Sequence, residues 1–369
     1  MKKFDKDKAL LGLAGPVLAL AVAFLLTTFV LVVSGLNPIE PYELMIQDAE
    51  FPDVQVNIIN QTGIYYLAAL AVAVGFRMNL FNIGVDGQYR LAAMIAAVVG
   101  ASVELPGPLH VLLITLVAVL VGAFWAGIAG FLKTTRGVSE VVSTIMLNAI
   151  ATSLIAWMLL PSNLGVQPPG SNNLTTGDIS ESGWMTGLEL EGGNIYGFTF
   201  VAFGLGIVYW FVLNRTRFGF DLRATGASQT AAQASGVDAK RMTLTAMLIS
   251  GGVAGLTGMP LLLGQTHTYS LSFPAGVGFT GITIALLGRN SPVGIFFAAL
   301  LISFLEKSSG SLDQFDYPKE ITTIMQGLIV ISVVVSYELV RQFGLRRQQQ
   351  KVGEELAAQA RKNKEDVAA

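Results

Sequence analysis

The sequence has no cysteine and few charged residues. The missing cysteine excludes disulfides, thiolate metal sites and cysteine nucleophiles. The two histidines, His110 and His267, are too few to form a histidine metal cluster. Charged residues make up 13% of the 369 residues, about half the usual share of roughly 25% in soluble domains. Together with a hydrophobic fraction of 52%, this indicates that lipid is the solvent.

Other kinds of chemistry are also missing. The net charge is −2, so no basic field favours nucleic acid. The chain contains no Gly-Lys dipeptide and therefore cannot hold ATP phosphates in a G-x-x-x-x-G-K-[ST] loop. Neither paired carboxylates nor a nucleophilic triad can be recognised, so we expect no catalytic site.

Long apolar runs divide the chain. A backbone in lipid must satisfy its hydrogen bonds within the segment, and a run of about 20 apolar residues is long enough for a spanning helix. The run at 9–33 is too long for a signal-peptide core, so we expect it to be kept. We predict an all-α membrane protein with about ten transmembrane helices, near 9–33, 60–76, 88–103, 109–132, 140–160, 196–213, 242–263, 275–288, 292–306 and 321–340.

Lys and Arg collect on the cytoplasmic side of membrane proteins. With the N-terminus inside, only Lys307 and Lys319 of the 23 basic residues fall on the outside. Both termini are therefore predicted to be cytoplasmic. We expect one transmembrane domain over 1–340, extracytoplasmic loops at 34–59 and 161–195, a cytoplasmic segment at 214–241 and a cytoplasmic tail at 341–369. The two outer loops are either connectors or a docking surface for an extracytoplasmic partner.

A polar stretch, Asn79–Arg90, interrupts two apolar runs. Its amides carry both donors and acceptors, which suit an uncharged polar solute, and its glycines allow a broken helix. Asp86 and Arg90 have the spacing of a local ion pair on a helix. The stretch is either a plain turn or part of a translocation pathway. In the second case Asn79, Asn82 and Gln88 face the pathway, and Gly84 and Gly87 shape the break.

Two further spans carry polar or aromatic candidates. Asn148 lies within an apolar span and needs a partner there. It either joins helices or lines the pathway. Phe279, Thr280 and Thr283 lie in the short eighth span. They either pack closely, or contact the solute, with the aromatic ring stacking on a nucleobase as rings do in nucleic-acid sites.

The cytoplasmic segment 214–241 contains a short stretch of small residues, Ala227–Ser235, between Gly226 and Gly236. This pattern predicts a short helix bounded by turns. Thr230-Ala231-Ala232-Gln233-Ala234-Ser235-Gly236 resembles the EAA-x-x-x-G signature of ABC-importer permeases, with Thr230 in place of the glutamate. The resemblance implies a helix that docks on an ATP-hydrolysing subunit through Gln229, Thr230, Ala231, Ala232 and Gly236.

The resemblance extends over about 60–340. FNIGVDGQ at 81–88, GVSEVVSTIMLN at 137–148 and ALLGRNSPVGI at 285–295 are similar to the nucleoside-type permeases of the ribose and branched-chain-amino-acid permease superfamily. It implies a ten-helix permease in a bacterial-type inner membrane that binds no cofactor itself. The implied partners are a second permease, identical or related, two cytoplasmic ATPase subunits that use ATP, and an extracytoplasmic substrate-binding lipoprotein.

Three functions remain open at this stage. The first is a permease subunit, not itself an enzyme, that carries nucleosides by alternating access. The second is the same machinery carrying a simple sugar such as ribose. The third is a self-sufficient secondary transporter or channel, which usually places ionisable residues at mid-membrane. The predicted spans hold few such residues, which favours the ATP-driven importer.

Overall fold

The computed structural model describes residues 6–310, 312–315, 317–318, 320–329, 331–332, 335–336, 339 and 342. The predicted tail at 341–369 lies outside these residues except for Gln342, as do the N-terminal Lys2 and Lys3. The chain divides into two compact units. One contains the described residues up to Leu44 and those from Leu312 onward, and the other is Met45–Gly310.

The smaller unit contains α1 (Lys6–Val33), the short turn η4 (Leu312–Phe315) and the helical residues 320–329. Within it, the rings of Phe24 and Tyr42 lie 4.9 Å apart. Tyr317 donates a hydrogen bond to the Glu40 carboxylate at 2.6 Å. Burial and this bond raise the pKa of Tyr317 to about 12.

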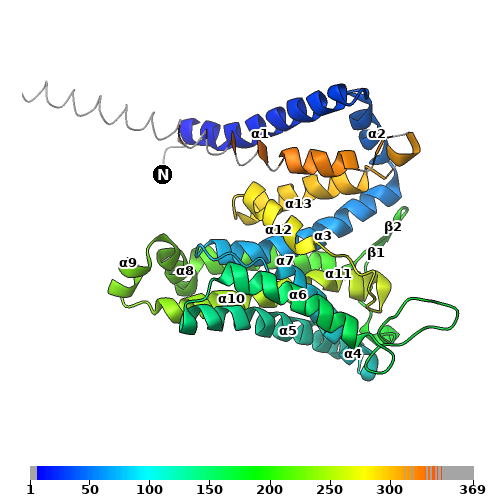
Figure 1. The fold of residues 1–369 in the computed structure, drawn as a ribbon, viewed down its shortest axis with the longest axis vertical. Coiled ribbons are helices and arrows are strands. Elements are labelled where there is room, and N and C mark those ends of the chain that lie inside the picture. Colours follow the sequence, from blue (N-terminus) through cyan, green and yellow to red (C-terminus); the bar gives the residue numbers. More distant parts are fainter. Residues whose placement is uncertain are drawn as a thin grey trace, which may run out of the picture. The chain divides into compact units, whose positions relative to one another are not determined.

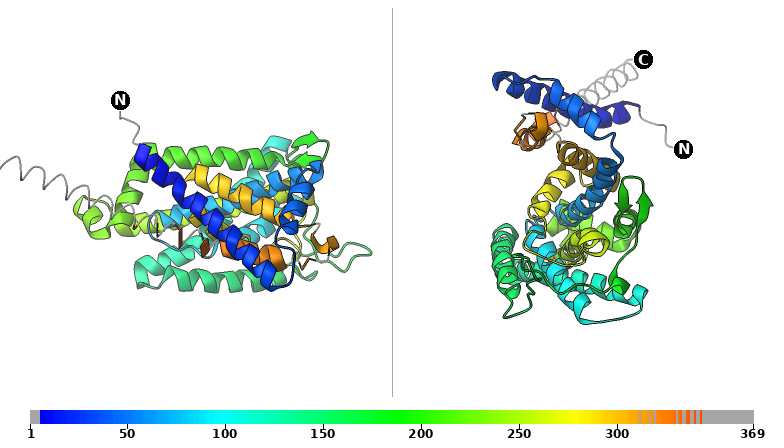
Figure 2. Two further views of the ribbon diagram at one scale, coloured as in Figure 1. Left: turned by 90° about the horizontal axis from the view of Figure 1, so that it is seen from above. Right: turned by 90° about the vertical axis from the view of Figure 1, so that its right-hand side faces the viewer.

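The larger unit is a bundle of helices that lie side by side (Figures 1 and 2). The long helices α3 and α10 are mostly buried inside it, and α5, α6 and α7 expose much more of their surface. Its elements are α3 (Pro52–Phe76), α4 (Val85–Ser102), α5 (Gly107–Arg136), α6 (Glu140–Met158), α7 (Gly197–Arg215), α8 (Arg217–Ala227), α9 (Gln229–Ala234), α10 (Ala239–Gly255), α12 (Val277–Leu287) and α13 (Pro292–Lys307). Helix α2 (Glu40–Asp48) crosses the boundary between the units.

Every predicted span coincides with helix in the described residues. Five of the described helices are long and apolar enough to cross a membrane, and α12 is a shorter apolar helix. One of the five is α10 with its continuation to Thr266 through η2 (Leu256–Gly258), α11 (Met259–Leu261) and η3 (Leu262–Thr266). The chain is therefore a mostly helical, multi-pass membrane protein.

Small residues bring α5 and α10 into contact. A Cβ on Gly122 of α5 would overlap the backbone of Gly251, and a Cβ on Gly255 would overlap the backbone of Ala118. Small residues let helix backbones approach closely in membranes, where packing drives association. Gly251 and Gly255 therefore serve the packing of α10 on α5.

The segments predicted as outer loops contain more helix than expected. Residues 34–59 hold α2 and the first two turns of α3. Helix α3 begins at Pro52, earlier than the predicted 60, because proline suits the first helical turn and Asp53 favours the positive helix start. Residues 161–195 hold the short turn η1 (Glu181–Gly183) and the hairpin β1 (Leu188–Leu190) with β2 (Gly193–Ile195).

The hairpin and the pair α8–α9 lie at opposite ends of the larger unit (Figure 1). Helix α9 confirms the predicted short helix, and Gly236 follows it with φ +85°, a conformation that favours glycine. Gly226 does not bound this helix as predicted. It lies inside α8, and the break falls at Ser228, whose side chain accepts from the Ala231 amide and caps α9.

A candidate pathway at two broken helices

The polar stretch between α3 and α4 contains a non-helical loop, residues 77–84, which we call the return. Asn82 and Gln88 exchange two amide hydrogen bonds, of 2.9 and 2.8 Å. Asn82 also donates to Ser250 Oγ at 2.9 Å, and Ser250 donates to the Ala71 carbonyl at 2.6 Å. Asn82, Gln88 and Ser250 are all buried. Because each amide is bonded within the protein, this network fixes the return against α3 and α10.

Asn148 of α6 clamps the same return from the other side. Its side chain donates to the Ile83 carbonyl at 2.9 Å and accepts from the Gly87 N–H at 2.9 Å. These two backbone groups flank the start of α4, where intrahelical partners are missing. Asn148 therefore joins α6 to the beginning of α4.

The two glycines of the break have close neighbours. A Cβ on Gly87 would lie 2.9 Å from the Cα of Asn148, and a Cβ on Gly84 would lie 3.0 Å from the Cβ of Thr144. Glycine is thus needed at Gly87 to bring α4 and α6 together, and Gly84 is the residue that precedes α4.

Asp86 connects α4 to a second broken helix. Its carboxylate accepts from the backbone N–H groups of Gly276, at 2.8 Å, and Gly278, at 3.3 Å. These groups begin α12, so the Asp86 side chain caps a helix distant in sequence. Among the described residues no ion pair joins Asp86 to Arg90. The predicted local pair is wrong for this conformation, because the carboxylate is engaged by the start of α12.

Helix α12 is too short to cross a bilayer. Its 11 residues span about 16 Å, and a hydrocarbon core is about 30 Å thick. It runs in the same direction as α3: Gly281 packs on Ala68, and the Arg77 guanidinium donates to the Asn290 carbonyl at 2.7 Å. Since Ala68 lies well inside α3, α12 begins inside the bundle and ends at the same level as α3.

An aromatic cluster supports the non-helical segment that precedes α12. Tyr89 donates to the Pro274 carbonyl, and the rings of Tyr269 and Phe273 stack 4.8 Å apart. All three rings are buried. Non-helical backbone at membrane depth occurs where it is enclosed by protein or lines a cavity. The cluster supplies this enclosure.

The three predicted residues of α12 fall on its more exposed side. Phe279 is exposed, and Thr280 and Thr283 are half-buried. Gly278 and Gly281 face the other way, where a Cβ would overlap the backbone of Asp86 or lie 2.9 Å from Ala68. Helix α12 therefore packs with glycines on one side and leaves one phenyl ring and two hydroxyl groups toward the other.

Asn79 lies away from this polar centre. Its φ of +54° is in the left-handed region, which asparagine tolerates better than most residues. Its side chain donates to the Gly226 carbonyl of α8 at 2.8 Å. The structure thus brings Asn79 to the segment that carries α8 and α9, whereas Asn82, Gln88 and Asn148 meet around the start of α4.

The predicted coupling residues lie on and after α9. Gln229, Thr230, Ala231 and Gly236 are exposed, and Ala232 is buried. A cavity of about 410 Å³ lies next to this segment and is lined by residues that include Phe220, Asp221, Gly236 and Arg241. Phe220 of α8 is 63% exposed, and sequence reasoning missed it because its apolar ring lies outside every long apolar run.

Sequence reasoning also missed polar groups inside the bundle. Tyr65 of α3 is buried and donates to the Glu306 carboxylate in the last turn of α13. Arg90, counted with the cytoplasmic residues, is buried in α4 and donates to Thr152 Oγ1 at 3.4 Å. The described spans thus contain more ionisable groups than expected. Glu306 and Lys307 directly follow an apolar run in the sequence, and this position indicated an ionisable group at the end of a span.

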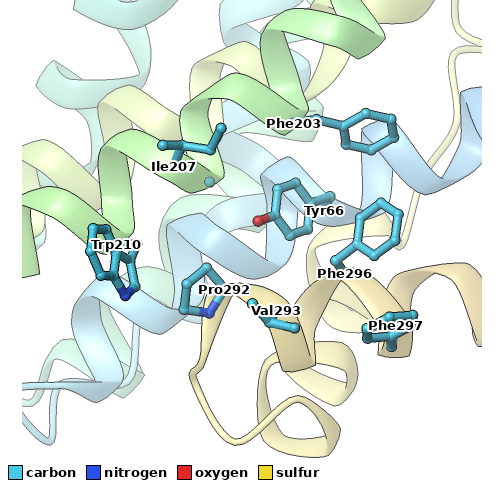
Figure 3. Close-up of a pocket in the computed structure, with 9 residues that line it drawn as sticks. Tyr66, Phe203, Ile207, Trp210, Pro292, Val293, Phe296 and Phe297 are labelled. Carbon is cyan, nitrogen blue, oxygen red and sulfur yellow. The ribbon is translucent and has the colours of Figure 1, made fainter.

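A second, mostly apolar groove lies between α3, α7 and α13 (Figure 3). It has a volume of about 520 Å³. Of its nine lining residues, only Tyr66 and Trp210 carry a polar side-chain group. The rings of Phe203, Phe296 and Phe297 lie on one side of it, and Trp210 and Pro292 lie on the other. Because the lining offers few hydrogen bonds, this groove does not suit a polar solute.

At the end with the hairpin, His267 stacks on Trp184 with ring centroids 4.0 Å apart. Burial lowers the pKa of His267, and the nearby Asp178 opposes the shift. The Ile179 N–H donates to the His267 carbonyl at 3.0 Å. The long loop 161–195 is thereby fastened to the residues after η3. Among the described residues, no three His, Asp or Glu side chains gather as metal ligands.

Comparison with known proteins identifies relatives. Residues 54–334 match the protein family described as branched-chain amino acid transport system / permease component. The chain is 34% identical over 346 residues to the guanosine ABC transporter permease protein NupP of Bacillus subtilis, covering 90% of this chain and 96% of the relative. It is 31% identical to the nucleoside ABC transporter permease protein NupB of Lactococcus lactis, covering 87% and 90%.

A sugar permease is also similar. The glucose ABC transporter permease protein TsgB13 of Haloferax volcanii is 29% identical over 336 residues, covering 89% of this chain and 88% of the relative. The similarity to all three relatives spans most of each chain, and the family match at 54–334 includes the broken helices and the segment that carries α8 and α9.

Proposed function

This chain belongs to the family of branched-chain amino acid transport system permease components, and we propose that it carries nucleosides as the membrane subunit of an ATP-driven importer. The permeases of this family are transport subunits. The chain thus supplies the route through the membrane, and the ATP is used by partner chains.

One observation carries the proposed pathway: α12 begins inside the bundle, with Asp86 bonded to its first amides. In transporters, half-helices that begin near the bilayer midplane mark the place where the solute binds. The more exposed side of α12 presents Phe279, Thr280 and Thr283. A ring for stacking and hydroxyls for hydrogen bonding suit a nucleoside, which has a flat base and a polar sugar.

The amides around α4 have a supporting role in this proposal. Asn82 and Gln88 bond to each other, and Asn148 bonds to the backbone of the break. In this conformation they hold the return that positions Asp86. Their direct contact with solute stays a prediction, and it requires a second conformation in which these bonds open. Gly84 and Gly87 provide the close packing that the return needs.

We propose ten spans, of which the eighth consists of the non-helical segment before α12 together with α12. Both termini and α8–α9 lie in the cytoplasm, and the membrane is of the bacterial inner type. The support is the distribution of Lys and Arg, which leaves the hairpin end nearly free of both. On this topology, the loops 34–59 and 161–195 face outward and meet a substrate-binding lipoprotein. The tail at 341–369 lies in the cytoplasm.

The coupling surface consists of the exposed residues Gln229, Thr230, Ala231 and Gly236, with Ala232 packed beneath them. Two ATPase subunits and a second permease, identical or related, complete the proposed importer. Small side chains on a short projecting helix allow close docking into a groove of a partner. Substituting Ala231 or Gly236 by a bulky charged residue is expected to abolish uptake and leave membrane insertion intact.

A simple sugar is the second candidate cargo, because the glucose permease relative covers as much of the chain as the nucleoside permeases do. The two cargoes differ in the base, which only a nucleoside can stack on Phe279. The deciding experiment is uptake of a labelled nucleoside by cells that express the importer, in competition with unlabelled nucleosides and pentoses. Nucleosides are expected to compete. Competition by ribose alone would overturn the nucleoside assignment.

A further inference from the structure

Loop 77–80 connects the coupling segment to the broken helices. Asn79 donates to the Gly226 carbonyl at 2.8 Å, across 147 positions of sequence. A Cβ on Gly226 would overlap the backbone of Arg77, so the two backbones are already in contact. Helix α9 is in contact with α8, and its residue Ala232 is buried. A displacement of α9 and α8 therefore reaches Asn79 without passing through a long spanning helix.

The segment that follows Asn79 is fixed along its length. The Phe81 N–H donates to the Glu140 carboxylate at 3.4 Å. Asn82 bonds to Gln88 and Ser250, and the Ile83 carbonyl bonds to Asn148. Because these bonds join residues 81–83 to one another and to α6 and α10, a displacement at Asn79 is not absorbed by bending within the segment.

The other end of this segment is Asp86, which holds the first amides of α12. We propose that Asn79 is a positioning residue of the transport cycle, which passes the movement of α8 and α9 through residues 79–86 to the start of α12. This inference rests on the proposed function. It assigns Asn79 to the coupling of ATP use to transport, and it removes Asn79 from the residues that contact the solute.

Two variants test the link, and one matched variant controls for it. Asn79→Asp keeps a residue that tolerates positive φ but points an oxygen at the Gly226 carbonyl. Asn79→Gly keeps the backbone conformation and removes the amide. Asn214→Asp is the control, because the Asn214 amide lies at the same end of the bundle and, within the described part of the chain, donates only to the Trp210 carbonyl of its own helix.

The measurement is the number of nucleosides transported per ATP hydrolysed, by the complete importer in proteoliposomes. A lost coupling contact of this kind is expected to lower that ratio about fivefold or more in both Asn79 variants, while Asn214→Asp retains the wild-type ratio. A merely structural role for Asn79 would lower ATP hydrolysis and transport together and leave the ratio unchanged, which would overturn the inference.

Measurements on the wild-type importer distinguish failure of the proposed function from failure of the Asn79 link. If it transports no nucleoside, the proposed function fails and the link fails with it. If it transports nucleosides and both Asn79 variants keep its ratio, the link alone fails. If Asn79→Asp does not assemble with its partners, Asn79→Gly decides, because it introduces neither charge nor backbone strain.

Discussion

The contact between Asp86 and the start of α12 stabilises that helix start by a free energy that can be measured. Asp86→Ala removes the acceptor of two backbone N–H groups, those of Gly276 and Gly278. A buried donor left without a partner costs about 1–3 kcal/mol. The bond to Gly278 is long at 3.3 Å, so we expect a total of about 2–4 kcal/mol. Because a tenfold change corresponds to about 1.4 kcal/mol, local opening should become about 30-fold or more easier.

Asp86→Asn is the matched variant. It keeps an acceptor oxygen for the same amides and loses the charge that favours a helix start, worth about 0.3–1 kcal/mol when partly exposed. Removing that charge also removes part of the cost of burying it. We therefore expect Asp86→Asn to lie much closer to the wild type than Asp86→Ala.

The assay is amide hydrogen exchange of the assembled importer, followed in the peptide that covers residues 274–281. A peptide from the middle of α13 serves as internal control and should not change. Unchanged exchange at 274–281 in Asp86→Ala would refute the assignment of Asp86 as the cap of α12. Equal acceleration in Asp86→Ala and Asp86→Asn would refute the reasoning from the acceptor oxygen.

Three further predictions concern other contacts. Gly87→Ala should destabilise the importer by about 1–3 kcal/mol, because the new methyl group meets the Asn148 backbone. Thermal unfolding measures the loss of stability. The control is Gly204→Ala, where a Cβ meets nothing within 4 Å, and it should be neutral. An equal loss of stability in both variants would contradict the prediction. Phe220→Ala should reduce copurification of the ATPase subunits, since it removes an exposed ring beside α9; unchanged recovery would exclude this ring from the interface. Folding lowers the pKa of His267, so the folded state favours the neutral imidazole. This contribution to stability is fully present above the unfolded pKa of about 6.5, and it is lost as the pH falls below that value. Hydrogen exchange of residues 176–184, corrected for intrinsic rate, should rise between pH 7 and pH 5 in the wild type, and His267→Gln should flatten this dependence.

Much of the fold could be predicted from the sequence, because the apolar runs that fix the helices are local. The short helix α9 and the break between α3 and α4 were equally visible, from small residues in one case and from clustered amides and glycines in the other. The early start of α3 at Pro52 was hidden, since polar residues alternate with the apolar ones in its first two turns. Local pattern thus predicts where helices lie better than where they begin.

The partners of the polar residues could not be predicted. Asp86 has a plausible partner four residues away in Arg90, but it bonds to Gly276, which lies 190 residues away. Asn79 resembles its neighbours Asn82 and Gln88 in chemistry, yet it contacts α8 and they contact each other. Such choices depend on how helices far apart in sequence meet, which one sequence does not specify.

The most direct test of the central claim is transport by purified protein. This chain alone and the complete importer are reconstituted in separate proteoliposomes, and uptake of a labelled nucleoside is followed with and without ATP. We predict uptake only by the complete importer and only with ATP. Uptake by this chain alone, without ATP, would contradict the account and show a self-sufficient transporter or channel.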